Sequence, residues 1–337
     1  MNRQLKTRIA AYLAVSSLML ACLPAAYSAE PVYVNIPGFE KLEFSGCMPA
    51  SEEDCFWVCS DENKKVVWKI NAASGAIEAF SWEKKKLNDM EGLCGDGRGG
   101  ALVLCSQSLN KRGEPRDSRQ RLSWFTSESW DGGDRFTIEG FRQILLNDFE
   151  WLQAYSEKLP KQGGLDVEGI AYDAQHDMLI LGFRGPLVSA ADPAIAGDNA
   201  ILLLLDGFMK RWESGVLGEN NKWEDKGNPR LLDLGGLGIR DLYLADSGNL
   251  IILAGELGGN APGEHPPQKL FHYDWRSGAT PTLLMNVEQV PSQMGTDVPW
   301  SAAEGVCDVS VNGNPKLVVV YDSEKSGIYR VIDIPER

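Results

Sequence analysis

The chain has 337 residues, with 47 acidic side chains against 33 basic ones and a formal net charge of −14. This acidic balance argues against a nucleic-acid partner, because phosphate backbones attract basic surfaces. Apart from its first 28 residues, the chain is long enough for one large domain or two small ones.

The N-terminus has the pattern of a signal peptide. Its basic residues Arg3, Lys6 and Arg8 precede the apolar stretch Ile9–Ala26. The small residues Ala26 and Ser28 then occupy the two key positions before a cleavage site. We therefore expect residues 1–28 to be removed, which changes the net charge from −14 to −17. Residues 29–337 are expected to form the mature domain, in the periplasm or secreted.

Two alternatives for this segment stay open. It can be retained as a membrane anchor, or Met19–Cys22 can act as a lipoprotein box, although its residues match such a box poorly. No later segment reaches the 18 apolar residues that a spanning helix needs, so no further membrane span is expected.

A short phrase recurs along the mature chain: a carboxylate, a glycine and an apolar run. It occurs at Asp89–Cys94, Asp166–Ala171 and Ala303–Cys307, and each copy leads through a turn into a second β-prone run. Alignment of the second runs adds two copies, so that five first strands begin near residues 43, 89, 166, 239 and 303. Internal recurrence of a strand pair is typical of a propeller or a solenoid.

Further strands are predicted after each pair, between turn residues. In chain order they are Lys65–Ile70, Ala76–Phe80, Arg121–Thr126, Arg135–Ile144, Ala200–Asp206, Arg230–Leu234, Lys269–Tyr273, Thr280–Leu284 and Gly327–Ile332. The last repeat is one strand short, and Val32–Ile36 is a spare strand that can complete it. The predicted fold is an all-β, single, five-bladed β-propeller closed by its N-terminal strand. The alternative is a six-bladed propeller in which Asp131–Leu159 contains the additional blade, although Leu145–Leu159 has a helical pattern.

The repeat also predicts where a site lies, because equivalent positions in a radial repeat converge on one axis. The residue before the glycine, or its equivalent, is here called the ring position. The five ring positions are Ser45, Glu91, Glu168, Arg240 and Glu304. Residues that end the second strands, among them Ser106 and Arg184, are expected on the same face, as are the long loops Gln107–Arg119, Gly185–Asn199 and Leu257–Gln268.

Three carboxylates near one axis need compensation, because like charges raise one another's pKa. A divalent cation, the guanidiniums of Arg184 and Arg240, or protonation can supply it. Oxygen ligands favour calcium or magnesium, whereas the three histidines have no metal-type spacing. The alternative is an ion network that only holds the blades in register.

A basic stretch lies in the first long loop. Lys111, Arg112, Arg116, Arg119 and Arg121 can hold an anionic substrate through charge-assisted hydrogen bonds. A solvated loop without a ligand is the alternative.

Six cysteines remain after cleavage, an even number that suggests disulfides in an exported chain. Cys47 and Cys55 can pair across a hairpin, and Cys59 and Cys105 can pair between neighbouring blades. The alternative is that several are buried thiols.

Several segments resemble a bacterial family known only as a domain of unknown function. They are Asp166–Ala171, Leu181–Pro186, Leu234–Asp241, Ala254–Gly255, Ala303–Gly305 and the loop Ser106–Arg121. The resemblance covers most of the mature chain and implies no reaction. A weaker resemblance is to phytase-like and gluconolactonase-type propellers, in which a Glu-Gly opening implies an axial metal. Arg240 and Ser45 depart from that pattern, which puts the metal in doubt.

The sequence thus predicts a hydrolase of a phosphate or ester substrate, assisted by calcium if a metal is bound. The expected metal ligands are Glu91, Glu168 and Glu304, and the expected ligand-binding residues are Arg184, Arg240, Asp241, Ser106 and Ser45. The alternative is a propeller that binds a ligand or a protein without turnover and has a structural Glu/Arg ring. We expect a small-molecule, anionic ligand or a protein as the partner, and a monomer.

Overall fold

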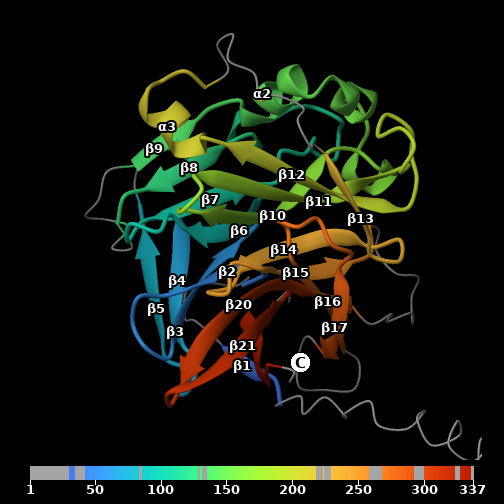
Figure 1. The fold of residues 1–337 in the computed structure, drawn as a ribbon. Coiled ribbons are helices and arrows are strands. Elements are labelled where there is room, and N and C mark those ends of the chain that lie inside the picture. The colour runs from blue at the N-terminus through green and yellow to red at the C-terminus, as the bar shows by residue number, and fades with distance from the viewer. Residues whose placement is uncertain are drawn as a thin grey trace, which may run out of the picture.

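The structure, a computed structural model, describes residues 30–34, 42–82, 86–127, 130, 135–217, 223, 229–257, 268–291, 300–322 and 327–334. Within these ranges five four-stranded antiparallel sheets form a ring, which is the five-bladed β-propeller that the sequence predicted (Figure 1). The first strand of each blade is innermost and contacts the first strands of both neighbouring blades.

The strands of each blade follow one another in the chain. Blade 1 has β2 Phe44–Pro49, β3 Cys55–Ser60, β4 Val66–Asn71 and β5 Ile77–Ser81; blade 2 has β6 Met90–Gly95, β7 Ala101–Cys105, β8 Leu122–Phe125 and β9 Arg135–Ile138; blade 3 has β10 Asp166–Asp173, β11 Met178–Val188, β12 Asn199–Asp206 and β13 Arg230–Asp233; blade 4 has β14 Gly238–Leu244, β15 Leu250–Gly255, β16 Gln268–Tyr273 and β17 Thr282–Val287. A two-stranded ladder, β18 Val290–Pro291 with β19 Trp300–Ser301, precedes blade 5.

Blade 5 contains both ends of the described chain. Its strands are β20 Ala303–Val311, β21 Asn314–Tyr321, β22 Gly327–Asp333 and the N-terminal β1 Val32–Val34. The β1 strand pairs with β22 in antiparallel register, Val32 opposite Tyr329 (Figure 1). The first and last strands of the fold therefore close the ring, as predicted.

The core lies between the blades, where strand faces of neighbouring sheets pack together. The β7 strand is buried at every position, because its two faces contact different blades. The outermost strands β5 and β17 consist mainly of partly buried and exposed residues instead. No helix in the described residues is long and apolar enough to cross a membrane.

One predicted strand, Arg135–Ile144, was too long. The β9 strand ends at Ile138, and the helix α2 spans Phe141–Asp148. Gly140 separates them with a φ of 67°, a conformation that glycine adopts without strain. The short 3-10 helices η1 Asp117–Arg119, η2 Glu150–Tyr155 and η3 Pro160–Gln162 and the helix α3 Phe208–Glu213 complete the fold. Helix α2 and η2 occupy the stretch that could have held a sixth blade.

The six described cysteines are free thiols, and neither predicted disulfide is formed. In the β2–β3 hairpin Cys47 lies opposite Val58 rather than Cys55. The thiol of Cys59 lies 3.8 Å from the carbonyl oxygen of Met90, to which it donates. Cys22 and the predicted signal peptide lie outside the described residues.

Candidate functional site

Every first strand contains a β-bulge near its start, and in each blade the ring position is the residue left without a partner; the β10–β11 pair has a second irregularity, at Arg184 of β11. Ser45, Glu91, Glu168, Arg240 and Glu304 have no Cα partner on the second strand, whereas the residues on both sides of each are paired. A bulge bends the strand and redirects the side chain of the extra residue. The five ring positions therefore share one local backbone geometry as well as one place in the repeat.

The glycines after the bulges allow neighbouring first strands to approach closely. A Cβ atom on Gly46 would lie 2.5 Å from the carbonyl oxygen of Glu91, and one on Gly92 would lie 2.7 Å from that of Glu168. A Cβ atom on Gly305 would lie 3.0 Å from the amide nitrogen of Cys47. Any larger residue at these positions would push the blades apart at the axis.

In blade 4 the residue after the bulge is Asp241, where blades 1, 2, 3 and 5 have a glycine. Its side chain is 0 % exposed, and its carboxylate accepts hydrogen bonds from the amides of Leu242 and Val306, both at 2.8 Å. The amide of Cys47 donates to it as well. Asp241 therefore joins blades 4, 5 and 1. The sequence assigned it to ligand binding, but its acceptors are directed at backbone amides, so we leave it out of the proposed site.

Two arginines and two glutamates form a connected group, here called the ring network: Glu168, Arg184, Arg240 and Glu304. The Nη1 atom of Arg184 lies 2.8 Å from Oε1 of Glu168, and Nη1 of Arg240 pairs with Oε1 of Glu304. Arg240 also faces Oε2 of Glu168 at 4.0 Å. The carbonyl oxygen of Glu256 accepts from both arginines, at 3.3 Å and 3.4 Å. The structure thus brings together four of the residues that the sequence placed at the site.

Two polar atoms of the ring network have no hydrogen-bond partner among the described residues. Oε2 of Glu168 and Nε of Arg240 are buried and make no hydrogen bond within the described part of the chain. The two residues are 4 % and 5 % exposed. Buried polar atoms are nearly always satisfied, so these two atoms indicate that the axis accommodates water or a polar ligand.

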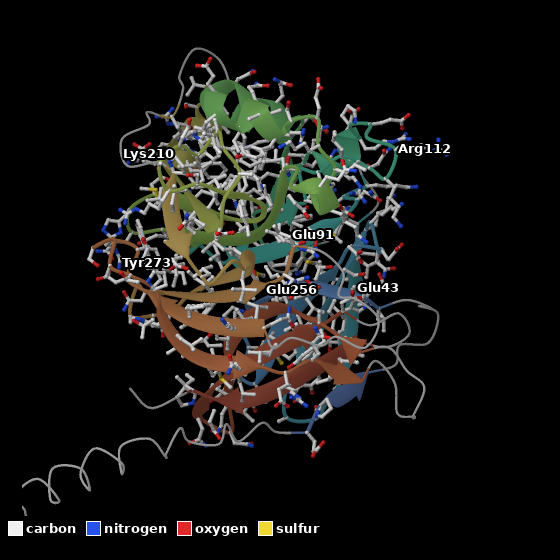
Figure 2. All side chains as sticks on the ribbon, turned by 90° about the vertical axis from the view of Figure 1, so that its right-hand side faces the viewer. Glu43, Glu91, Arg112, Lys210, Glu256 and Tyr273 are labelled. Atoms are coloured by element: carbon white, nitrogen blue, oxygen red, sulfur yellow. The ribbon has the colours of Figure 1, made fainter. Side chains whose placement is uncertain are left out.

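Glu91, near the centre of the view in Figure 2, differs from Glu168 and Glu304, which pair with arginines. No side-chain hydrogen bond or ion pair of Glu91 is found within the described ranges. Burial raises its pKa well above the ordinary value, and the carboxylates of Asp89 and Glu168 raise it further. Burial also raises the pKa of Glu304, to about 7, although Arg240 acts in the opposite direction. The axis therefore combines ion-paired glutamates with one that has no cation.

Ser45 and Ser106 orient neighbouring acids. Oγ of Ser45 accepts the amide hydrogen of Asp61 at 3.0 Å. Ser106 donates to the carboxylate of Asp89, which also forms an ion pair of 2.6 Å with Arg119. Burial, followed by the charge of Glu43, raises the pKa of Asp61 to about 8.

The sequence placed Asp61 on the face of the site, but it did not assign Asp89 and Asp166 to the site. Asp89 and Asp166 stand two residues before their ring glutamates, so the recurring Asp-x-Glu-Gly spacing was the available signal. Asp166 is buried, and burial together with Glu168 raises its pKa.

The residues at the axis do not fit the predicted three-glutamate calcium site. Glu168 and Glu304 each bind an arginine, and a cation there would have to displace a guanidinium. Within the described residues, the carboxylates whose oxygens come close enough for shared coordination are those of Glu43, Asp61 and Glu62 instead.

The ring of blades and the polar group at its axis define a five-bladed propeller with an axial carboxylate–arginine site. Residues 138–330 match the family described as "Protein of unknown function (DUF3616)", and the chain belongs to this family. This confirms the resemblance stated from the sequence. No curated protein matches the chain.

Solved structures with a similar arrangement are distant in sequence. A luciferin-regenerating enzyme has 11 % identity and a TM-score of 0.43, over 90 % of this chain and 97 % of that one. The mannose phosphorylase MPT-4 from Leishmania mexicana, solved with a phosphate ion, has 10 % identity and a TM-score of 0.48, over 97 % and 95 %. The WD40 repeats of RRP9 have 9 % identity and a TM-score of 0.31, over 86 % and 67 %.

Proposed function

We propose that the axial site hydrolyses an ester, with Glu91 as the general base and without a metal ion. The observation that carries this proposal is the contrast between Glu91 and the ring network. Glu168 and Glu304 are held by arginines, whereas Glu91 has no cationic partner within the described residues and has a raised pKa. A carboxylate with a raised pKa is a stronger base for proton transfer than an ordinary carboxylate.

In the proposed reaction the Glu91 carboxylate accepts a proton from a water molecule while the water oxygen attacks the ester carbonyl carbon. The carbonyl oxygen then carries negative charge, which a preorganised donor can stabilise. Arg184 is suited to this role because Glu168 holds its guanidinium and 21 % of its side chain is exposed. The bond to the leaving alkoxide breaks, and the proton passes from Glu91 to that oxygen.

Arg240 has a structural role in the proposed site and does not contact the substrate. Its side chain is 6 % exposed and pairs with Glu304, so it supports the ring network from within. The axial arginines are thus engaged with glutamates and with the carbonyl oxygen of Glu256. This favours an uncharged ester group at the axis over a phosphate there, because a phosphate would have to compete with both carboxylates.

We also propose that the protein is exported, with residues 1–28 as the signal peptide and residues 29–337 as the mature propeller. The basic N-terminus and the apolar run support this proposal. We expect the mature protein to be a monomer, and N-terminal sequencing of the secreted fraction together with its sedimentation mass checks both expectations.

A panel of carboxylic esters, lactones and phosphate esters tests the reaction, with calcium and then with a chelator. We expect turnover of carboxylic esters that the chelator does not change, and a loss of at least about 100-fold in kcat for Glu91→Gln. Glu213→Gln, at an exposed ion pair on α3, is the matched control and should keep full activity.

The same panel separates the alternatives. Activity lost on chelation would support a calcium-dependent hydrolase and overturn the metal-free proposal. Binding of a ligand or protein at the axis without turnover of any substrate would leave the non-catalytic propeller with a structural Glu/Arg ring.

A further inference from the structure

A cleft opens beside the axial site, between blade 1 and the long loop 107–119 of blade 2. Its volume is about 630 Å³. The charged residues that line it are Asp61, Glu62, Lys64, Asp89, Lys111, Arg112, Arg116 and Arg119. Five of these eight side chains are cationic, in a chain whose net charge is −14, so the cleft is a local exception to the acidic character of the protein.

The cations of the cleft are only partly neutralised. Arg116 pairs with Glu114 at 2.9 Å, and Arg119 pairs with Asp89 at 2.6 Å. Lys111 and Arg112, at the tip of the loop, form no ion pair within the described ranges, and Arg112 projects at the edge of the molecule (Figure 2). Lys64, on the blade 1 side of the cleft, likewise has no ion pair among the described residues, and Lys111 and Arg112 are the two cations that the loop offers to an anionic group.

Two acids that line the cleft lie close enough to the axial site to act on Glu91. They are Asp61 and Asp89, whose charges raise the pKa of Glu91. Glu91 itself lies nearer the centre of the molecule than Arg112 in the same view (Figure 2). The cleft and the axial site are therefore neighbours.

The loop that carries the cations is held in place at its root and at its tip. Arg142 of α2 donates to the carbonyl oxygen of Gln107, and the amide of Gln107 donates to the carbonyl oxygen of Arg119 at 2.9 Å. At the tip, Oδ1 of Asn110 accepts the amides of Arg112 and Glu114, at 2.8 Å and 3.0 Å. A loop ordered in this way presents its cations without a large ordering cost on binding.

We propose that this cleft binds an anionic group, a phosphate, sulfate or carboxylate, of the same ligand whose ester group lies at the axis. The inference rests on the proposed function for the axial end of the ligand, but the cleft can be tested by itself. The proposal assigns the anionic part of the substrate to Lys111 and Arg112 of the loop rather than to Arg184 and Arg240 at the axis.

The first experiment measures binding of inorganic pyrophosphate by calorimetry at low ionic strength. We expect binding to the wild type, and an affinity at least about tenfold weaker in the double variant Lys111→Ala/Arg112→Ala. Lys210→Ala is the control, because Lys210 is an exposed cation of α3 on the opposite side of the view from Arg112 (Figure 2). Equal weakening by the control, or no binding by the wild type, overturns the proposal. So does binding of a long polyanion without binding of pyrophosphate.

The second experiment compares two aryl esters with acyl chains of similar length, a neutral butyrate and a glutarate whose free carboxylate is anionic. We expect the wild type to prefer the glutarate in kcat/KM and the double variant to lose this preference. Hydrolysis of both esters without preference overturns the cleft proposal and leaves the axial function. Pyrophosphate binding that depends on Lys111 and Arg112 without any hydrolysis overturns the axial function and leaves the anion site.

Discussion

Glu168 is the residue on which the ring network depends, because it pairs with Arg184 and faces Arg240. Glu168→Gln removes the negative charge between two guanidiniums. We expect the free energy of unfolding in urea to fall by about 3 kcal/mol, since an uncompensated buried charge is costly. The exposed control Glu213→Gln should stay within about 0.5 kcal/mol of the wild type.

Calcium provides a second measurement on the same residue. Because arginines compensate Glu168 and Glu304, the wild-type Tm should not respond to calcium or to a chelator. A Tm that rises with calcium in the wild type and not in Glu168→Gln would establish the metal site instead.

The raised carboxyl pKa values predict a direction for stability against pH. The pKa of Asp61 rises from 3.8 to about 8 and that of Glu304 from 4.5 to about 7. The native state therefore binds more protons than the unfolded chain across this range, and its free energy of unfolding falls as pH rises from about 4 to about 8. Urea unfolding at pH 5 and pH 8 should show the higher stability at pH 5. Asp61→Asn should reduce the difference, and an unchanged difference would contradict the assignment.

At the scale of elements, α2 supports the loop 107–119 through Arg142. This side chain is 4 % exposed and donates to the carbonyl oxygens of Gln107 and Ser156. Arg142→Met should cost about 2 kcal/mol, because two acceptors lose their donor. Amide hydrogen exchange in 107–119 should accelerate. Gln143→Met on the exposed side of the same helix is the control, and equal exchange in both variants would contradict this role.

The elements were predicted well where apolar repetition determines them. All five first strands begin within one residue of the expected position, since each is buried between two blades. The strand predicted over Arg135–Ile144 was wrong in its second half, because its apolar residues cover blade 2 from a helix rather than from a strand. The turn at Gly140 changes the spacing of the apolar residues from that of a strand to that of a helix. The few residues on either side of the turn are too few to reveal this change from the sequence.

The candidate site was predictable only in part. Convergence of the ring positions followed from the repeat, and in the structure Arg240 of blade 4 pairs with Glu304 of blade 5. The bulges were not predictable, because a bulge is a property of the register between two strands. The structural role of Asp241 was also missed, since its amide donors come from Val306 and Cys47 in other blades.

For the whole molecule, closure of the ring by β1 is the feature most open to experiment. A chain that begins at residue 42 lacks β1 and leaves the edge of β22 unpaired. We expect a lower Tm and concentration-dependent association, because an open strand edge can pair with another chain. A chain that begins at residue 30 is the control. Equal melting and equal scattering of the two chains would show that β1 does not contribute to closure.

Asp241 has a consequence for the order in which the protein folds. Its carboxylate becomes buried within blade 4, but one of its donors belongs to blade 5 and another to blade 1. A nascent chain that has ordered only blades 1 to 4 would hold this carboxyl group without its Val306 donor, which disfavours stable partial rings. Assembly should therefore be cooperative and wait until the C-terminal strands have been synthesised. A chain released too early would remain unfolded rather than persist as an incomplete propeller.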